Sequence, residues 1–388
     1  MNDNNEKSPQ NRIIVIITLL VTIFFCFCII EAFFRILLLN ESFYLYLFPM
    51  GKNSVRINDP YLSWALKPGK SSNNPFIPGV ELNINSYGFR DHEFERNKPP
   101  GTFRIFCMGD STTFGLEVKS EETYPEVAEK ILTHAISREK GLDNKISNFE
   151  ILNAGTPGYS SLQGLVLLKR KILKYQPDMI TLSYGFNDYT YREPGSEDKN
   201  FIGDLGLKNQ VRYYLGKTMT YNFIKRLVVK KEKPLMPFGN EKPGKGGSHR
   251  VVLTDYLKNL EDIVRIAGEN NIKVIFLSIA NPYRMQMKEL GNMLDLPFFD
   301  TTEFFRDKLD DIKENPEKYD LSKNDYNESV INSDTYHEIF TEEDMKVYHS
   351  GYFYFDAVHP NALGHSLIGK RIAGMILEEC GLTNSSIR

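Results

Sequence analysis

The chain has 388 residues, a formal net charge of −3 and a hydrophobic content of 41%. This length is enough for one large domain with insertions or for two small domains. A charge so close to zero argues against a dedicated nucleic-acid binder, which usually presents a strongly basic surface, and we expect no nucleic-acid partner. Four cysteines are too few for a disulfide scaffold. The sequence also lacks the paired C-x-x-C motifs that are typical of metal sites.

The N-terminal segment is strongly apolar. Residues 13–30, IIVIITLLVTIFFCFCII, carry no charge, and the apolar character continues to residue 39. About 20 apolar residues are enough for a helix to cross a bilayer. A cleaved signal peptide is the alternative, but its apolar core would be shorter and followed by small residues, whereas Glu31 and Arg35 follow here. We therefore expect residues 1–40 to be an uncleaved single-pass anchor that contacts the membrane through residues 13–39. The flanking basic residues do not decide its orientation.

The rest of the chain changes character near residue 100. Residues 41–100 are rich in Asn, Pro and Gly and predict an N-terminal extension of loops and short strands. After it, we predict strands at 103–108, 149–154, 178–184, 273–280 and 297–300, and helices at 124–136, 162–173, 253–271 and 362–379. Apolar strands separated by helices indicate βαβ units and a mainly parallel sheet covered on both faces.

Two stretches interrupt this alternation. Residues 190–250 contain the basic segment YNFIKRLVVKKEK, and residues 302–350 are markedly acidic. Long segments without a clear pattern are usually solvated insertions, and that is our expectation for both. A lid or a partner surface is the alternative.

Small and polar residues follow the strands where a site would form. Gly109-Asp110-Ser111 follows the first predicted strand, NAGTPGYSS (153–161) the second, and Gly185-Phe186-Asn187-Asp188 the third, while FDAVHPNALGH (355–365) precedes the last helix. Each stretch alone could be an ordinary turn. In open parallel sheets, however, sites form beyond the carboxyl ends of the strands, where one crevice could gather all four stretches.

These residues suit acyl transfer to a serine. The Ser111 hydroxyl is a weak nucleophile that needs an adjacent base, and His359 can supply it. Asp356 lies three residues earlier, close enough to fix the tautomer of the imidazole. The developing oxyanion needs preorganised donors, for which the backbone N–H groups of Ser111 and Gly158 and the side-chain amide of Asn187 are the candidates. Since Pro360 disfavours a helix at His359, we expect the last helix to start at about Asn361.

Taken in order, these motifs resemble the four sequence blocks of the SGNH (GDSL) hydrolase superfamily: GDS at 109–111, the glycine of NAGTPG, GxND at 185–188 and DxxH at 356–359. The resemblance covers about residues 101–380. It implies a flavodoxin-like three-layer α/β/α sandwich, and a serine esterase or acyltransferase that uses no metal or other cofactor. It also implies roles for the matching residues: catalytic Ser111, Asp356 and His359, with an oxyanion hole formed by Ser111, Gly158 and Asn187.

The resemblance extends to the membrane. The anchor followed by NSYGFR is similar to membrane-tethered bacterial members whose catalytic domain lies outside the cytoplasm. We therefore expect a membrane-anchored esterase, with residues 101–388 as an extracytoplasmic hydrolase domain, acting on an acyl ester or an acylated glycan through an acyl-serine intermediate. An O-acyltransferase that modifies surface or exported polysaccharide is the nearest alternative, because only the acyl acceptor differs. A non-catalytic glycan-binding protein is the second.

Other motifs are less informative. There is no G-x-S-x-G nucleophile elbow, and GNEKPGKG (239–246) lacks the Ser or Thr that ends a P-loop. His349, His359, His365 and Asp356 show no recognisable metal-ligand spacing, so no metal is expected. The remaining expectations are structural. His365 should face the core or the rim of the site, Asp110 and Asp188 should cap turns, Tyr159 and Phe186 should pack, and Trp64 should pack the N-terminal extension onto the domain.

Overall fold

The computed structural model describes residues 9–40, 54–74, 77, 79–138, 146–192, 197–203, 206–228, 247–323, 340–356 and 358–382. The chain divides into two compact units, one formed by residues 1–54 and 206–236 and the other by residues 55–205 and 237–388. The larger unit contains the residues expected to form the site.

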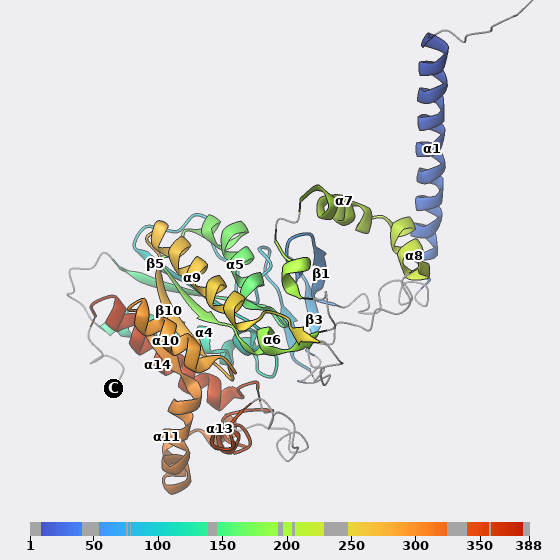
Figure 1. The fold of residues 1–388 in the computed structure, drawn as a ribbon. Helices are drawn as coiled ribbons and strands as arrows, with labels where there is room; N and C mark the ends of the chain where they lie inside the picture. Colours follow the sequence, from blue (N-terminus) through green and yellow to red (C-terminus); the bar gives the residue numbers. More distant parts are fainter. Residues whose placement is uncertain are drawn as a thin grey trace, which may run out of the picture. The chain divides into compact units, whose positions relative to one another are not determined.

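A five-stranded parallel sheet forms the centre of the larger unit (Figure 1). Its strands are β5 (Thr102–Gly109), β6 (Asn148–Gly155), β7 (Met179–Ser183), β10 (Lys273–Ser278) and β11 (Phe298–Asp300). They lie in the order β11-β10-β7-β5-β6, and β5 is hydrogen-bonded to both β6 and β7. Numbered along the sheet, this is the flavodoxin-like order 2-1-3-4-5, which places the switch point of the topology beside β5.

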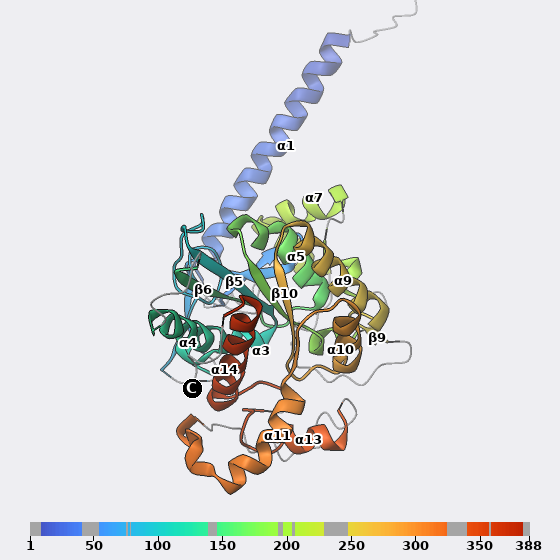
Figure 2. The same ribbon diagram turned by 90° about the vertical axis from the view of Figure 1, so that its left-hand side faces the viewer.

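Helices cover both faces of this sheet (Figures 1 and 2). On one face, α4 (Tyr124–Arg138), α11 (Thr301–Glu314) and α14 (Ala362–Glu379) pack against side chains such as Ile105. On the other, α5 (Ser161–Arg170), α9 (Leu253–Glu269) and α10 (Arg284–Met293) pack against the alternate ones, such as Phe106. Strands buried on both faces need apolar residues at nearly every position, which explains the unbroken apolar runs in the sequence. The predicted three-layer sandwich is confirmed.

The N-terminal extension folds onto this unit as two small antiparallel pairs. They are β1 (Arg56–Asp59) with β2 (Ser63–Leu66), and β3 (Ser71–Asn73) with β4 (Glu81–Asn83). Trp64 on β2 stacks edge-on against Tyr159 at a centroid distance of 5.7 Å, and its indole N–H donates to the carbonyl of Pro157 at 3.3 Å. The prediction that Trp64 packs the extension onto the domain is confirmed.

Several shorter elements complete the larger unit. They are α3 (Ser111–Phe114), α6 (Phe186–Tyr189), α13 (Glu342–Tyr348), the pair β8 (Tyr191–Arg192) with β9 (Ser248–His249), and single 3₁₀ turns at 120–122, 172–175, 198–200, 316–318 and 321–323. The helix expected at 162–173 ends at Arg170, because the chain tightens into the 3₁₀ turn that follows. Helix α10 has no counterpart among the predicted elements. Helix α11 lies at the start of the stretch 302–350 and buries Phe305 and Ile312 in the core.

The smaller unit consists of α1 (Pro9–Leu37), α7 (Gly206–Gly216) and α8 (Met219–Val228). Among the described residues, one helix is long and apolar enough to cross a membrane, the stretch Arg12–Leu37 with a mean hydropathy of 3.3. A signal sequence near the N-terminus would meet the same criterion. The predicted apolar helix is present, and its retention as an anchor stays a prediction.

Candidate active site

Ser111 lies at the carboxyl edge of the sheet, in the turn between β5 and α3. Asp110 caps α3 by accepting hydrogen bonds from the backbone N–H of Thr112 at 2.9 Å and from its hydroxyl at 2.8 Å. Only glycine fits at position 109, because a Cβ there would lie 2.1 Å from Oγ1 of Thr113 and 2.9 Å from the carbonyl oxygen of Ser183. The Gly-Asp-Ser sequence therefore ends the strand tightly and places Ser111 at the first position of the helix.

His359 lies in the loop before α14, and Asp356 organises that loop. One carboxylate oxygen of Asp356 accepts hydrogen bonds from the backbone N–H groups of Val358 and His359, both at 2.7 Å. Asn361 then caps α14 by accepting from the N–H of Gly364 at 2.9 Å, so the helix starts where the sequence predicts. Asp356 thus fixes the loop backbone as well as contacting the imidazole.

The structure brings Ser111, His359 and Asp356 together, although Ser111 and His359 are 248 positions apart in the chain. Nε2 of His359 lies 2.8 Å from Oγ of Ser111, and Nδ1 of His359 lies 2.8 Å from Oδ2 of Asp356. With the proton on Nδ1 donated to Asp356, Nε2 is the acceptor for the serine hydroxyl. Ser111 and His359 are both buried. This is the hydrogen-bonded series that nucleophilic catalysis by serine requires.

A second carboxylate, which the sequence analysis missed, also faces His359. Oε1 of Glu117 lies 3.5 Å from Nδ1 of His359, and its Oε2 is buried with no hydrogen-bond partner among the described residues. Glu117 lies in the loop after α3 and carries no motif, so only the folded chain reveals it. Burial, which disfavours the charged carboxylate, raises the pKa of Glu117 to about 7.

The carboxylates of Asp356 and Glu117 shift the pKa of the His359 imidazole. Burial lowers the pKa of His359, but the carboxylates of Asp356 and Glu117 outweigh it and raise that pKa to about 10. Burial also opposes ionisation of Asp356, yet the adjacent His359 and the two backbone N–H donors outweigh it and hold the Asp356 pKa below its ordinary value. The two carboxylates therefore favour the protonated, imidazolium form of His359.

The three expected oxyanion donors surround the same edge of the sheet. The N–H of Ser111 opens α3 and so has no acceptor within that helix. Gly158 adopts a φ of +83°, a left-handed conformation that favours glycine. One N–H of the Asn187 side-chain amide donates to Oδ2 of Asp110 at 2.9 Å, and an amide has a second N–H for another acceptor. Asp110 therefore orients Asn187 as well as capping α3.

The peptide between Pro157 and Gly158 is held from the N-terminal extension. The Pro157 carbonyl accepts from Nη2 of Arg56 at 3.0 Å and from the indole N–H of Trp64 at 3.3 Å. In a trans peptide the C=O and N–H bonds point in opposite directions. Donors from Arg56 and Trp64 therefore fix the direction in which the Gly158 N–H points, namely away from the extension.

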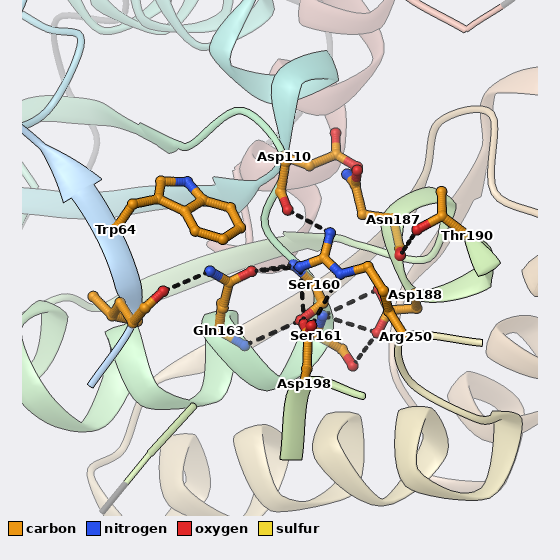
Figure 3. Close-up of polar contacts among 12 residues, drawn as sticks. Trp64, Asp110, Ser160, Ser161, Gln163, Asn187, Asp188, Thr190, Asp198 and Arg250 are labelled. Atoms are coloured by element: carbon orange, nitrogen blue, oxygen red, sulfur yellow. Dashed lines mark hydrogen bonds and ion pairs between the residues drawn. The ribbon is translucent and has the colours of Figure 1, made fainter. Parts of the chain in front are cut away.

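A buried arginine, Arg250, fixes the other side of Gly158. Figure 3 shows Arg250 with its partners Asp198 and Gln163. Arg250 donates to the carbonyl of Gly158 at 2.8 Å, to both carboxylate oxygens of Asp198 at 3.0 and 2.9 Å, and to Oε1 of Gln163 at 3.0 Å. Ser160 donates to Asp198 at 2.5 Å. No sequence motif assigns a role to Arg250 or Asp198, and both lie in the stretch predicted to be a solvated insertion.

Asp188 joins the loops that carry Gly158 and Asn187. It accepts from the hydroxyl of Ser161 at 2.5 Å and from its backbone N–H at 3.0 Å, at the start of α5. Burial raises the pKa of Asp188 to about 7. The expectation that Asp188 is a capping carboxylate is confirmed, with the difference that it caps a neighbouring helix. The capping prediction for Asp110 is also confirmed.

The remaining candidates are structural. His365 is fully buried, its Nδ1 accepts from the backbone N–H of Tyr124 at 3.2 Å, and burial lowers its pKa to about 3, so it is a neutral core residue, as expected. Tyr159 and Phe186 are buried in the apolar core, which confirms packing.

Two clusters in the described part of the chain have carboxylate and imidazole atoms close enough to share a metal ion. They are Asp91 with His92 and Glu126, and Glu117 with Asp356 and His359. Neither includes His349 or His365. Both ring nitrogens of His359 already have hydrogen-bond partners, Ser111 and Asp356, so the second cluster suits proton transfer better than metal ligation.

The fold is a flavodoxin-like sandwich, and a serine, a histidine and an aspartate lie in hydrogen-bonded series at the carboxyl edge of its sheet. This is the arrangement found in serine hydrolases. Residues 105–372, well over half of the chain, match the model of the GDSL-like Lipase/Acylhydrolase family. The chain belongs to this family and is a hydrolase that acts on ester bonds. No curated protein matches it significantly.

Several solved structures are similar to the chain. The lipase/acylhydrolase from Enterococcus faecalis is 16% identical, with 71% of this chain and 96% of that chain covered and a TM-score of 0.34. A GDSL-like lipase from Bacteroides thetaiotaomicron is 14% identical, with coverages of 71% and 89% and a TM-score of 0.35. A two-domain esterase active on acetylated mannans is 14% identical, with coverages of 71% and 49% and a TM-score of 0.36. At this similarity they add nothing to the family assignment.

Proposed function

We propose that the protein is a membrane-anchored serine esterase that works through an acyl-serine intermediate, with Ser111 as nucleophile, His359 as general base and Asp356 as its orienting partner. The observation that carries this assignment of roles is the pair of 2.8 Å contacts from His359, through Nε2 to the Ser111 hydroxyl and through Nδ1 to the Asp356 carboxylate.

The reaction follows from this geometry. Oγ of Ser111 attacks the ester carbonyl carbon while its proton moves to Nε2 of His359. The carbonyl oxygen becomes an oxyanion that accepts hydrogen bonds from the N–H groups of Ser111 and Gly158 and from the amide of Asn187. When the tetrahedral intermediate collapses, His359 gives its proton to the leaving alcohol, and the acyl group stays on Ser111. Water, activated by His359 in the same way, then releases the acid.

The anchor is the second part of the proposal. A leader peptide that is removed has no need for contacts with the mature chain. Glu31 of α1 nevertheless accepts hydrogen bonds from the backbone N–H groups of Met219 and Thr220 at 3.0 Å each, in the same unit of the protein. This contact supports retention of α1. The extracytoplasmic placement of the hydrolase domain follows from the resemblance to membrane-tethered bacterial members.

Labelling with a fluorophosphonate tests the roles of the site residues. We expect it to modify Ser111 in the native protein and to leave Ser111→Ala unmodified. Ser111→Ala and His359→Ala should each abolish hydrolysis of a small activated ester, and the double variant should be scarcely worse, because the two residues act as one unit. Asp356→Asn should keep weak activity, since nucleophile and base remain. All variants should stay folded by circular dichroism.

The same experiment separates the alternatives. A folded protein that neither takes the label nor cleaves any ester would contradict the esterase proposal and favour glycan binding. An acyl-enzyme that only a carbohydrate hydroxyl discharges would instead identify an O-acyltransferase. A panel of acyl esters and acetylated glycans identifies the substrate class.

Mass spectrometry of the mature protein tests the anchor. The N-terminus should be intact in the membrane fraction, whereas a form processed after residue 40 would exclude an uncleaved anchor.

A further inference from the structure

Glu31 stands where the uncharged part of α1 ends, and its carboxylate holds the beginning of α8. Besides the backbone N–H groups of Met219 and Thr220, it accepts from the Thr220 hydroxyl at 3.0 Å and pairs with Arg35, one turn later in α1, at 3.0 Å. A carboxylate at a helix N-terminus satisfies donors that the helix leaves unpaired and interacts favourably with its dipole. The start of α8 is therefore fixed to α1.

An aromatic contact fixes α8 at a second point. The ring of Phe34 lies 4.7 Å from the ring of Phe223, centroid to centroid. Glu31 and Phe34 are three residues apart on one face of α1, and Thr220 and Phe223 are three residues apart on one face of α8. Two contacts on matching faces place α8 beside the C-terminal end of α1 (Figure 1).

Helix α8 divides into an apolar and a polar half. At 100° per residue, the apolar half holds Met219, Phe223, Ile224, Leu227 and Val228, and the polar half Tyr221, Asn222, Lys225 and Arg226. Three of the apolar side chains are largely exposed, Ile224 at 53%, Leu227 at 61% and Val228 at 75%. Three exposed apolar side chains on a helix of ten residues indicate a surface that binds another protein or a membrane.

Helix α7 presents a similar face. Its exposed apolar side chains are Leu207, Val211, Tyr214 and Leu215. Lys217, in the turn between the two helices, places its ammonium group 4.3 Å from the centre of the Tyr213 ring. Two consecutive amphipathic helices thus leave apolar side chains uncovered in the same unit as α1.

The place where α8 is attached identifies what covers it. The uncharged run of α1 from residue 13 to residue 30 has 18 residues and, at 1.5 Å each, spans about 27 Å, close to the hydrocarbon thickness of a bilayer. Glu31 directly follows this run, at the depth where hydrocarbon gives way to headgroups. The first turn of α8 is bonded to Glu31, so α8 starts at this depth. There its apolar half can face acyl chains and its polar half, with Lys225 and Arg226, can face headgroups.

We propose that α7 and α8 form an interfacial attachment. It lies in the surface of the bilayer that α1 spans, with anionic lipid headgroups beside the polar half of α8. This inference rests on the proposed anchor. The charge of the segment supports anionic lipids, since Lys225 and Arg226 are followed in the sequence by Lys230 and Lys231. Basic residues near such a surface are attracted by anionic headgroups.

Tryptophan fluorescence of the full chain in lipid vesicles tests this inference. The protein has one tryptophan, so the native chain supplies the background signal. Ile224→Trp places a probe on the apolar half of α8, and Lys225→Trp places a matched probe on the polar half one residue later. In vesicles with brominated acyl chains, we expect Ile224→Trp to be quenched about threefold more strongly, with blue-shifted emission. Binding of the segment should weaken when anionic lipid is replaced by zwitterionic lipid.

The outcomes separate this inference from the anchor on which it rests. If the chain floats with the vesicles and both probes are equally open to a water-soluble quencher, α8 lies in water or against a protein, and the interfacial attachment is wrong while the anchor stands. If the chain does not float with vesicles, the anchor itself fails. Hydroxyl-radical labelling of the unaltered chain needs no substitution: Ile224 and Leu227 should be protected and Tyr221 labelled, and the reverse pattern would overturn the inference.

Discussion

Asn187 and Asp188 are adjacent but act in different places. Asn187 can donate to charge that exists only in the transition state, whereas Asp188 accepts from Ser161 at the start of α5. We expect Asn187→Ala to lower kcat by roughly 10²–10³ with little change in Tm. Asp188→Ala should mainly lower Tm, because it leaves buried donors unpaired. Steady-state kinetics and thermal unfolding of both variants check this, and a larger loss of kcat at Asp188 would mean that the donor is misassigned.

Glu117 gives the reaction a predictable pH dependence. As the proposed base, His359 must be neutral to accept a proton from Ser111, so we expect activity to rise with pH as the imidazolium loses its proton. The charges of Asp356 and Glu117 raise the pKa of His359 to about 10. Glu117→Gln removes one of these charges and keeps the shape, so the rising limb of kcat/KM should move to lower pH. A pH profile of ester hydrolysis measures this, and an unchanged profile would show that Glu117 has no electrostatic effect on the base.

At the scale of elements, the short N-terminal extension holds the peptide whose N–H is a proposed oxyanion donor. Trp64→Phe removes the indole donor to the Pro157 carbonyl and leaves an aromatic ring in place. With the Gly158 N–H less firmly directed, we expect kcat to fall roughly tenfold while KM changes little, since the donor acts on the transition state.

Tyr159→Phe is the matched control for Trp64→Phe. It removes the hydroxyl that donates to the backbone carbonyl of Trp64 at 2.7 Å, without touching Pro157. This variant should lose stability and keep its kcat. Equal losses of kcat in both variants would show that the extension merely holds the fold together.

The elements also show what the sequence could and could not predict. Strand and helix positions followed from apolar patterning, since strands such as β5 are buried on both faces and α14 begins at a clear cap, Asn361. Ser111, His359 and Asp356 were predictable because local motifs carry them. Glu117, Arg250 and Asp198 were not, because their roles depend on contacts across long stretches of chain, such as the 92 positions between Arg250 and Gly158. Helix α10 was missed because it is short and only three of its ten residues are buried, although these three, Met287, Leu290 and Gly291, follow helical spacing.

At the scale of the whole molecule, the proposed membrane attachment involves only the smaller of the two units. Removing residues 1–54 alone would leave α8 without the helix that caps and contacts it, and would leave apolar side chains of α7 and α8 such as Leu227 exposed. We therefore expect the chain 55–388 to self-associate. The same chain with 206–236 replaced by a flexible Gly/Ser linker should be monomeric and should hydrolyse esters. Size-exclusion chromatography with light scattering compares the two, and aggregation of the second would show that residues 206–236 are needed by the hydrolase unit itself.

The distance along the chain between Ser111 and His359 has a consequence for the timing of activity. Ser111 is made first, and His359, its proposed base, follows 248 positions later. At roughly 5–20 residues per second, the ribosome needs on the order of 10–50 s to make the intervening chain. During that time the nascent protein has the proposed nucleophile without its base. A chain stalled before α14 would therefore be inert toward esters, because the proposed nucleophile and its base meet only after His359 has been made.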